Sequence, residues 1–224
     1  MSKKWLCFRR WKTDIRCCMI IDRNMFDKKD VIRFFDALAP EWDEETGREN
    51  GEIIRTLLDN AFVSNREDIL DVGCGTGRLF PYYLKRNVSS ITGIDISSGV
   101  IEIAKKKHSH EKIALICDDA AEHSFDRCFD RIVVFDAFPH FVDPKKTIEN
   151  LSKYLKEDGL LTIAHDASRE EINRRHGVMK SDVSHELMNI DELDNLVSEY
   201  LTVVTKISDG RMYQIVGRKE KDTF

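Results

Sequence analysis

The chain has 224 residues, of which 42% are hydrophobic and 33% are charged. This composition excludes a disordered chain, and no apolar run approaches the roughly 20 residues that span a bilayer, so we predict one sizeable domain. The charge is uneven, because residues 1–24 carry seven Lys and Arg against two Asp, while residues 25–224 have a net charge of −10. An acidic body repels a phosphate backbone, which argues against a nucleic-acid partner.

The first 24 residues form a segment of their own. Basic residues interrupt the apolar ones throughout, so we expect no secretory signal. We predict a disordered basic tail, or a segment that precedes a true start at Met19 or Met25, ahead of a domain over residues 25–224. The six cysteines form no CxxC pair and have no zinc-ligand spacing, which favours reduced thiols and a cytoplasmic location.

The predicted elements begin with two helices and then alternate. Helical spacing of apolar residues predicts helices over 27–39 and 49–62. Short apolar runs predict strands over 68–72, 90–95 and 113–117, with helices over 77–86 and 98–108 between them. In the second half, strands are predicted over 131–135 and 160–164 around a helix over 144–156, which Pro144 opens.

The carboxyl-terminal part changes character. Ser168 and Glu171 make a capping box that starts a helix, and a further helix is predicted around residues 190–197. Two strand patterns over 201–207 and 211–216 are joined by Ser208-Asp209-Gly210, which predicts a hairpin. The alternation predicts a parallel sheet with helices on both faces and right-handed crossovers, to which the hairpin adds an antiparallel edge.

The segment after the first strand carries the strongest functional signal. It reads Asp71-Val72-Gly73-Cys74-Gly75-Thr76-Gly77-Arg78 and opens a helix, at the strand end where open α/β sheets bind ligands. Glycines allow a tight turn and a close approach of ligand to backbone. The dinucleotide fingerprint G-x-G-x-x-G would need its third glycine at position 78, where the chain has arginine.

Two further acidic signals follow the next strands. Asp95 ends the second strand, 22 residues after Gly73, where a carboxylate can accept bonds from both hydroxyls of a ribose. The alternative is that Asp95 caps the next helix, although Ser97 and Ser98 are better placed as caps. After the third strand, Asp118 or Asp119, together with Ala120, could meet an adenine edge, and two solvated turn acids would give the same pattern.

Together these segments resemble the class I S-adenosylmethionine-dependent methyltransferases. The runs 71–77 (DVGCGTG), 93–95 (GID) and 118–120 (DDA) are similar to that family's first three motifs, and residues 129–140 resemble its fourth-strand segment. Residues 155–161 resemble its L-x-x-G-G-x-L turn, with Asp158 in place of the first glycine. Residues 33–43 (RFFDALAPEWD) look like the amino-terminal element of the ubiquinone and menaquinone biosynthesis type, in which Trp42 would cover the cofactor.

The resemblance implies a Rossmann-like, seven-stranded, mostly parallel sheet with a carboxyl-terminal antiparallel hairpin and an amino-terminal helical cap. It implies S-adenosyl-L-methionine as the cofactor and a small-molecule methyl acceptor. The expected cofactor-binding residues are Asp71, Gly73, Cys74, Gly75, Gly77, Asp95, Ile96, Asp118, Asp119, Ala120 and Asp136. Because an acid favours a bound sulfonium cation, Asp71 and Asp136 are expected near it.

The acceptor side is less specified. His140 follows the fourth strand and is a candidate base, or else a loop histidine bonded to backbone. His165 ends the fifth strand and is a second candidate base. His165, Asp166 and His176 form a weaker candidate for a metal site, and we predict none.

Three other functions share this pattern. They are a non-catalytic protein that binds the same cofactor, a protein or RNA methyltransferase, and a nicotinamide-dependent oxidoreductase, which Arg78 disfavours. The sequence leaves the acceptor, the methylated atom and the oligomeric state open.

Overall fold

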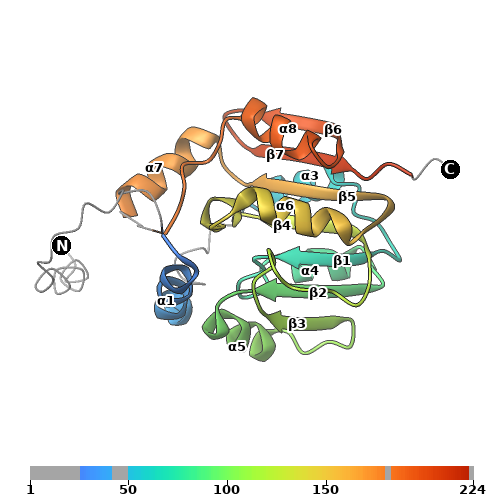
Figure 1. Cartoon of the computed structure of the whole chain (residues 1–224). Coiled ribbons are helices and arrows are strands. Elements are labelled where there is room, and N and C mark those ends of the chain that lie inside the picture. Colours follow the sequence, from blue (N-terminus) through green and yellow to red (C-terminus); the bar gives the residue numbers. More distant parts are fainter. Residues whose placement is uncertain (1–25, 42–49, 180–182, 222–224) are drawn as a thin grey trace, which may run out of the picture.

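Seven strands form one sheet in the computed structural model, which describes residues 26–41, 50–179 and 183–221 (Figure 1). The strand order is β3-β2-β1-β4-β5-β7-β6. The strands are β1 (Asp68–Val72), β2 (Ser90–Asp95), β3 (Ile113–Cys117), β4 (Phe129–Phe135), β5 (Leu155–His165), β6 (Thr202–Ser208) and β7 (Tyr213–Arg218). β1 to β5 pair in parallel, and β7 runs antiparallel to both β5 and β6. The predicted parallel sheet and terminal hairpin are confirmed.

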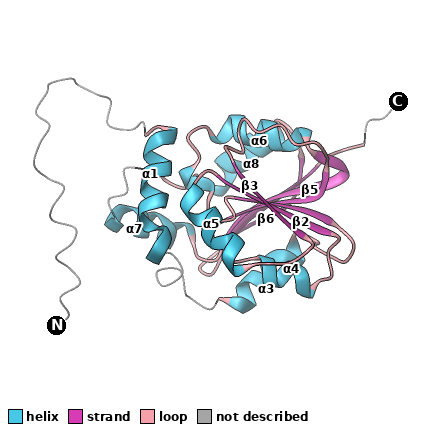
Figure 2. Ribbon diagram, turned by 90° about the horizontal axis from the view of Figure 1, so that it is seen from below, coloured by secondary structure: helices cyan, strands magenta, loops and turns pink. Residues whose placement is uncertain are grey.

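Helices cover both faces of this sheet (Figure 2). One face packs against α3 (Gly51–Asn60), α4 (Phe80–Lys85) and α5 (Ser98–Lys107), and the other packs against α6 (Pro144–Lys153) and α8 (Ile190–Ser198). Because side chains alternate along a strand, Ile69 packs in the hydrophobic core on the α3 side of the sheet, and its neighbour Leu70 packs in the core on the α6 side. Both side chains are fully buried.

Two further helices lie beyond the carboxyl ends of the parallel strands (Figure 1). α1 (Lys28–Leu38) begins with a capping box between Asp27 and Asp30 and continues into the 3₁₀ turn η2 (Ala39–Glu41). α7 (Arg169–Met179) begins where the Ser168 hydroxyl accepts a bond from the Glu171 amide at 3.3 Å, as predicted. A short 3₁₀ turn, η3 (Phe138–His140), follows β4 at the same end.

Three predicted boundaries differ from the structure by three residues or more. α4 begins at Phe80, later than the predicted position 77, because Gly77 has a φ of +86° and cannot belong to a right-handed helix. β5 begins at Leu155 because that residue pairs with Phe129, so α6 ends at Lys153 and not at 156. Asp158 has a φ of +59°, a left-handed conformation that favours glycine. This fits its place in the L-x-x-G-G-x-L turn, where it replaces the first glycine.

Some predictions fall on other parts of the chain. Residues 1–24 and Trp42 lie outside the described residues. Among the residues that are described, no helix is long and apolar enough to cross a membrane.

Candidate active site

The glycine loop after β1, residues 73–77, is hydrogen-bonded to the end of β2. The amides of Gly73 and Cys74 both donate to the carbonyl of Ile94, at 2.8 and 3.1 Å. Gly73 has a φ of +65°, and a Cβ placed on it would lie only 2.5 Å from the Cβ of Ala137. The loop therefore needs glycine at position 73, both for its backbone conformation and for its contact with the segment after β4.

Asp95 ties this loop to the end of β2. Its two carboxylate oxygens accept bonds from the amides of Gly75 and Ser97, each at 2.9 Å. Burial raises the pKa of Asp95, and the two backbone bonds oppose that shift. The cap of α5 is Ser97, whose hydroxyl accepts from the amide of Val100, so the serine capping prediction is confirmed. Each carboxylate oxygen has a second lone pair that a ribose hydroxyl could use.

The acids after β3 both have partners in the protein. Asp118 accepts from Nδ1 of His123 at 2.8 Å, and this hydrogen bond lowers the pKa of Asp118. Asp119 pairs with the Lys28 ammonium at 2.6 Å and accepts from the amide of Ala121. The expectation that one of these acids, with Ala120, meets an adenine edge stays a prediction.

These elements enclose a cavity of about 270 Å³. It runs from the ends of β3 and β2, across the glycine loop, to the segment after β4, and Val31 and Phe35 of α1 cover one side. Of the predicted cofactor residues, the lining includes Gly73, Gly75, Asp95, Ile96, Asp118, Asp119, Ala120 and Asp136, together with the candidate base His140. The structure thus gathers predicted site residues that lie up to 67 positions apart in the sequence, from Gly73 to His140.

The cavity has a strong excess of negative charge. Its lining contains the carboxylates of Asp95, Asp118, Asp119, Glu122, Asp136 and Asp143 against the ammonium groups of Lys28 and Lys146. Both lysines are already paired, because each lies within 2.7 Å of an oxygen of Glu122. A cavity with these charges favours a cationic ligand over an anionic one.

Four of the predicted residues are not in the lining of this cavity: Asp71, Cys74, Gly77 and His165. Asp71 is buried beneath the loop, and none of the described residues forms a hydrogen bond with its Oδ2. Burial, reinforced by the charge of Asp95, raises the pKa of Asp71 well above its ordinary value. Gly77 faces the rings of Phe80 and His108, so its position supports the turn into α4.

The sequence reasoning missed a polar network at the far end of the cavity. Arg78 donates to Asp136 at 3.1 Å and to Asp166 at 2.7 Å, and its guanidinium lies 5.2 Å from the centre of the Phe135 ring. Asn50 donates to the same oxygen of Asp166 at 3.2 Å. In the sequence, Arg78 at the position of the third glycine excludes the dinucleotide fingerprint, but it does not predict that Arg78 pairs with Asp136 and Asp166.

Asp136 is the centre of that network. It has a φ of +53°, which is uncommon for a residue other than glycine, and it lies directly after β4. Its Oδ1 lies 3.2 Å from Nδ1 of His165 and accepts from the amide of Asp166 at 3.3 Å. Strained backbone that its surroundings hold in place is typical of functional sites.

The two candidate bases differ in access. His140 lines the cavity, its Nδ1 lies 3.0 Å from the carbonyl of Val183, and burial lowers its pKa to about 4. Its ring meets that of Phe35 edge-on at 5.0 Å. His165 is only 1% exposed and lies behind Asp136, and within the described part of the chain its Nε2 has no hydrogen-bond partner.

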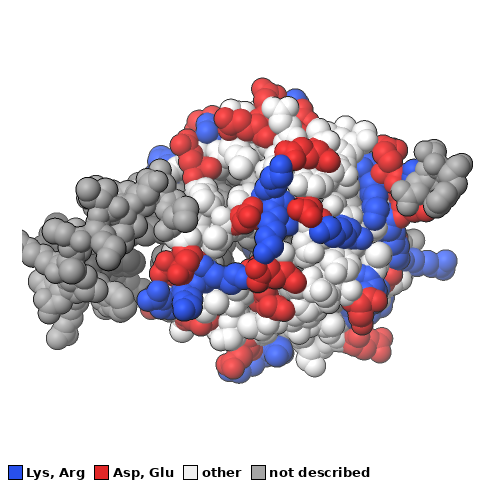
Figure 3. Space-filling view, viewed as in Figure 1, with Lys and Arg blue, Asp and Glu red and all other residues white. Residues whose placement is uncertain are grey.

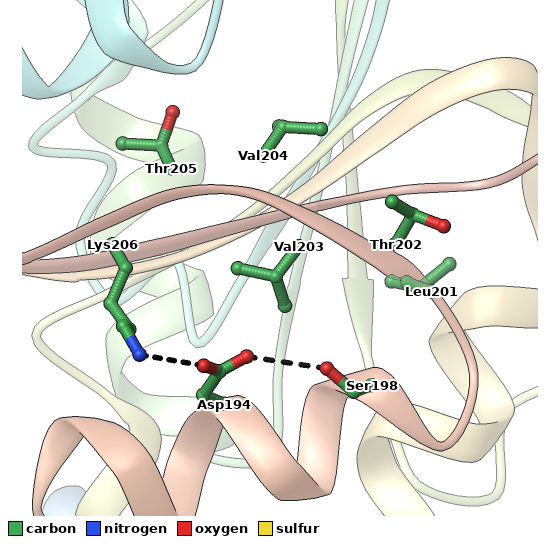
Figure 4. A pocket seen from close by; sticks show the side chains of 8 residues that line it. All are labelled: Asp194, Ser198, Leu201, Thr202, Val203, Val204, Thr205 and Lys206. Carbon is green, nitrogen blue, oxygen red and sulfur yellow. Dashed lines mark hydrogen bonds and ion pairs between the residues drawn. The ribbon is translucent and has the colours of Figure 1, made fainter.

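Other parts of the structure carry weaker features. In the described ranges, no group of three or more His, Cys, Asp or Glu side chains is arranged to hold a metal ion. A second hollow is a shallow groove between α8 and the edge strand β6, where Lys206 pairs with Asp194 at 2.7 Å (Figure 4). It contains none of the predicted site residues, and its charges neutralise each other.

Comparison with known proteins agrees with this geometry. Residues 70–163 match the family model described as a methyltransferase domain. The chain carries a methyltransferase domain. The matched segment begins in β1 and ends in β5, so it contains the glycine loop, Asp95, the acids after β3 and His140.

Curated relatives of this methyltransferase domain include two O-methyltransferases. The chain is 41% identical over 112 residues to malonyl-[acyl-carrier protein] O-methyltransferase of Priestia megaterium, covering 49% of this chain and 40% of that protein. It is 26% identical over 151 residues to the ubiquinone biosynthesis O-methyltransferase of Coxiella burnetii, covering 64% of each. The matches therefore span less than two thirds of either relative.

A solved structure shows the same fold. The N-methyltransferase NodS from Bradyrhizobium japonicum, in complex with S-adenosyl-L-homocysteine, superposes with a TM-score of 0.68 at 20% sequence identity. The match covers 86% of this chain and all of that one. The methyltransferase domain therefore has the Rossmann-like fold of the S-adenosylmethionine-dependent methyltransferases, as the sequence predicts.

Proposed function

We propose that this protein transfers the methyl group of S-adenosylmethionine to an oxygen atom of a small-molecule acceptor. The observation that carries the proposal is the acidic cavity over the glycine loop, because a sulfonium cofactor is cationic and needs bare backbone and carboxylates around it. The two O-methyltransferase relatives support oxygen as the methylated atom.

The strand order gives the cofactor a direction in the proposed complex. Asp95 would bind the ribose, and Asp118 or Asp119 with Ala120 would bind the adenine, at the ends of β2 and β3. The rest of the cofactor would then extend over Gly73 and Gly75 toward Asp136. The carboxylate of Asp136 would favour the positive charge by Coulomb attraction, whereas the raised pKa of the buried Asp71 favours its neutral form, so Asp71 would add little charge.

The protein's part in the reaction is alignment. The cofactor supplies a methyl group that is electrophilic by itself, so the chain mainly has to orient the acceptor and exclude water. Phe35 and Val31 of α1 cover the cavity and limit its contact with solvent. His140 is the candidate base that lines the cavity, and His165 would act through Asp136.

Surface charge, free cysteines and Arg78 support a small acceptor, a reducing compartment and a methyltransferase over the alternatives. On the face seen in Figure 3, acidic and basic side chains are interspersed, which gives a phosphate backbone no continuous basic area. Cys74, Cys117 and Cys128 are free thiols, which favours the cytoplasm as the location. Arg78 pairs with Asp136 and Asp166 where a dinucleotide fold would place its third glycine, which disfavours the nicotinamide alternative.

A turnover assay tests the proposal. The full chain is incubated with methyl-labelled S-adenosylmethionine and a panel of hydroxyl, carboxylate, amine and thiol acceptors, and formation of S-adenosylhomocysteine is measured. We expect label on an oxygen acceptor, and loss of that label in Asp95→Ala but not in Asp126→Ala, an exposed acid outside the cavity lining. Tight cofactor binding without turnover of any acceptor would favour the non-catalytic alternative.

A further inference from the structure

Three imidazoles from separate elements meet at the acceptor end of the cavity. They are His140 of η3, His165 at the end of β5, and His176 of α7, and we call them the histidine cluster. The rings of His140 and His176 lie 5.1 Å apart, and His165 reaches Asp136 at 3.2 Å. His176 lies outside the residues that match the methyltransferase family model, so the family match does not account for the cluster.

The hydrogen bonds fix the protons on two of these rings. Nδ1 of His140 faces the Val183 carbonyl, and Nδ1 of His165 faces the Asp136 carboxylate. Both partners can only accept, so each Nδ1 carries the proton and each Nε2 keeps a lone pair when the ring is neutral. The cluster therefore presents hydrogen-bond acceptors, of which the Nε2 atom of His140 belongs to a residue that lines the cavity.

Two atoms of the cluster have no hydrogen-bond partner among the residues that the structure describes. Nε2 of His165 is buried without a hydrogen bond, although the residue is only 1% exposed, and Nδ1 of His176 is buried without one as well. Unsatisfied buried polar atoms cost free energy, on the order of 1–3 kcal/mol each. Neither His165 nor His176 is in the cavity lining, so His140 is the member of the cluster that a ligand in the cavity could contact.

The surrounding charges indicate the kind of group. Burial lowers the pKa of His140 to about 4 and so keeps the ring neutral near pH 7, although the backbone hydrogen bond to Val183 and the charge of Asp136 oppose that shift. The cavity has six carboxylates and two ammonium groups, and both ammonium groups are paired. An anionic acceptor would meet lone pairs and negative charge, whereas a neutral hydroxyl would meet the acceptors it needs.

We infer that the acceptor's reacting group is a neutral hydroxyl whose proton passes to Nε2 of His140, an inference that rests on the proposed methyl transfer. The acceptor oxygen forms a bond to the methyl carbon while the bond from carbon to sulfur breaks, and that electron pair stays on sulfur as a thioether. The hydroxyl proton moves to Nε2 of His140, which becomes an imidazolium. An oxygen that gains a methyl group while still protonated is a much stronger acid than any imidazolium, so a weakly basic histidine suffices.

Asp136 and His165 assist this proton transfer without contacting the acceptor. The Asp136 carboxylate holds the His165 tautomer, and it lies close enough to His140 to stabilise a new positive charge there. His165 and Asp136 therefore act as positioning residues, and His140 is the group that contacts the acceptor.

Phenol and benzoate provide matched probes of this inference. They share one ring, but near pH 7.5 phenol is neutral and benzoate is an anion. The full chain is saturated with S-adenosylhomocysteine and titrated with each probe by calorimetry. We expect phenol to bind at least tenfold more tightly than benzoate, with this preference lost in His140→Leu, partly restored in His140→Gln and unchanged in His110→Leu, an exposed histidine outside the cavity.

The outcomes separate the two levels of the account. If S-adenosylhomocysteine itself fails to bind, the proposed function fails and the inference falls with it. If it binds, then equal or tighter binding of benzoate, no binding of phenol, or a preference that survives His140→Leu overturns the inference alone. Nitrogen NMR of the unmutated protein gives an independent test, because a proton on Nε2 of His140 would also overturn it.

Discussion

Replacement of Gly73 by alanine should damage both stability and cofactor binding. A Cβ at this position would lie 2.5 Å from the Cβ of Ala137, and the φ of +65° is one that side chains with a Cβ rarely adopt. The conformation costs roughly 1–2 kcal/mol and overpacking typically another 1–3, so we expect a loss of about 2–5 kcal/mol. For a chain of this size that is a fall in Tm of roughly 4–20 °C.

Gly177→Ala is the matched control for this substitution. Gly177 lies in α7 with an ordinary φ, and a Cβ added to it would meet no other atom within 4 Å. Alanine there should stabilise the protein by about 0.5–1 kcal/mol, because glycine is unfavourable within a helix. Urea unfolding followed by circular dichroism measures both variants, and calorimetry measures binding of S-adenosylhomocysteine. A Gly73→Ala protein with unchanged stability and affinity would refute the argument.

Three further substitutions test other parts of the structure. Lys28→Ala removes the ion pairs that join α1 to Asp119 and Glu122. It should raise the Kd for S-adenosylhomocysteine a few-fold, since exposed pairs contribute about 1 kcal/mol or less. The control Lys153→Ala breaks an ion pair on α6 and should leave this Kd unchanged. Arg78→Met leaves two carboxylates without their cation and should cost about 2–4 kcal/mol in urea unfolding, and adding Asp166→Asn should recover part of that loss; full stability of the single variant would contradict the network. Burial alone would raise the pKa of Asp68, but hydrogen bonds from Lys156, Ser90 and Arg127 outweigh it and lower the pKa to about 2. A depressed pKa stabilises the fold above the unfolded value near 4, so Asp68→Asn should cost about 2 kcal/mol at pH 7, with the difference from the parent protein shrinking as the pH falls from 4 to 2.

The strands of the parallel sheet were predictable because their signal is local. β1, β2 and β3 begin and end where the predicted strands do, and β1 and β2 are buried parallel strands, which need apolar residues between polar turns. β5 was predicted too short, because residues 156–158 are polar and this part of the strand joins the sheet through tertiary bonds. Leu155 pairs with Phe129 of β4, the amide of Lys219 donates to the Gly159 carbonyl, and the amide of Asp158 donates to the Lys219 carbonyl. Such pairing depends on segments that are remote in the sequence.

The site was predictable to the same extent. Glycine spacing and strand-end acids indicated the residues around the cavity, because the carboxyl ends of parallel strands meet at one edge of the sheet. The partners of Arg78 and the approach of His176 to His140 come from α7 and from the ends of β4 and β5, and no local pattern links them. Side chains that meet only through tertiary packing require the structure.

Cofactor binding is the most direct test of the central claim. The purified chain is titrated by calorimetry with S-adenosylhomocysteine and, separately, with NADH, and the titrations are repeated with Asp95→Ala and with Asp126→Ala. The account predicts a Kd for S-adenosylhomocysteine on the order of micromolar, at least tenfold weaker in Asp95→Ala and unchanged in Asp126→Ala, and no binding of NADH. Binding of NADH alone would contradict the account and make hydride transfer the function to pursue.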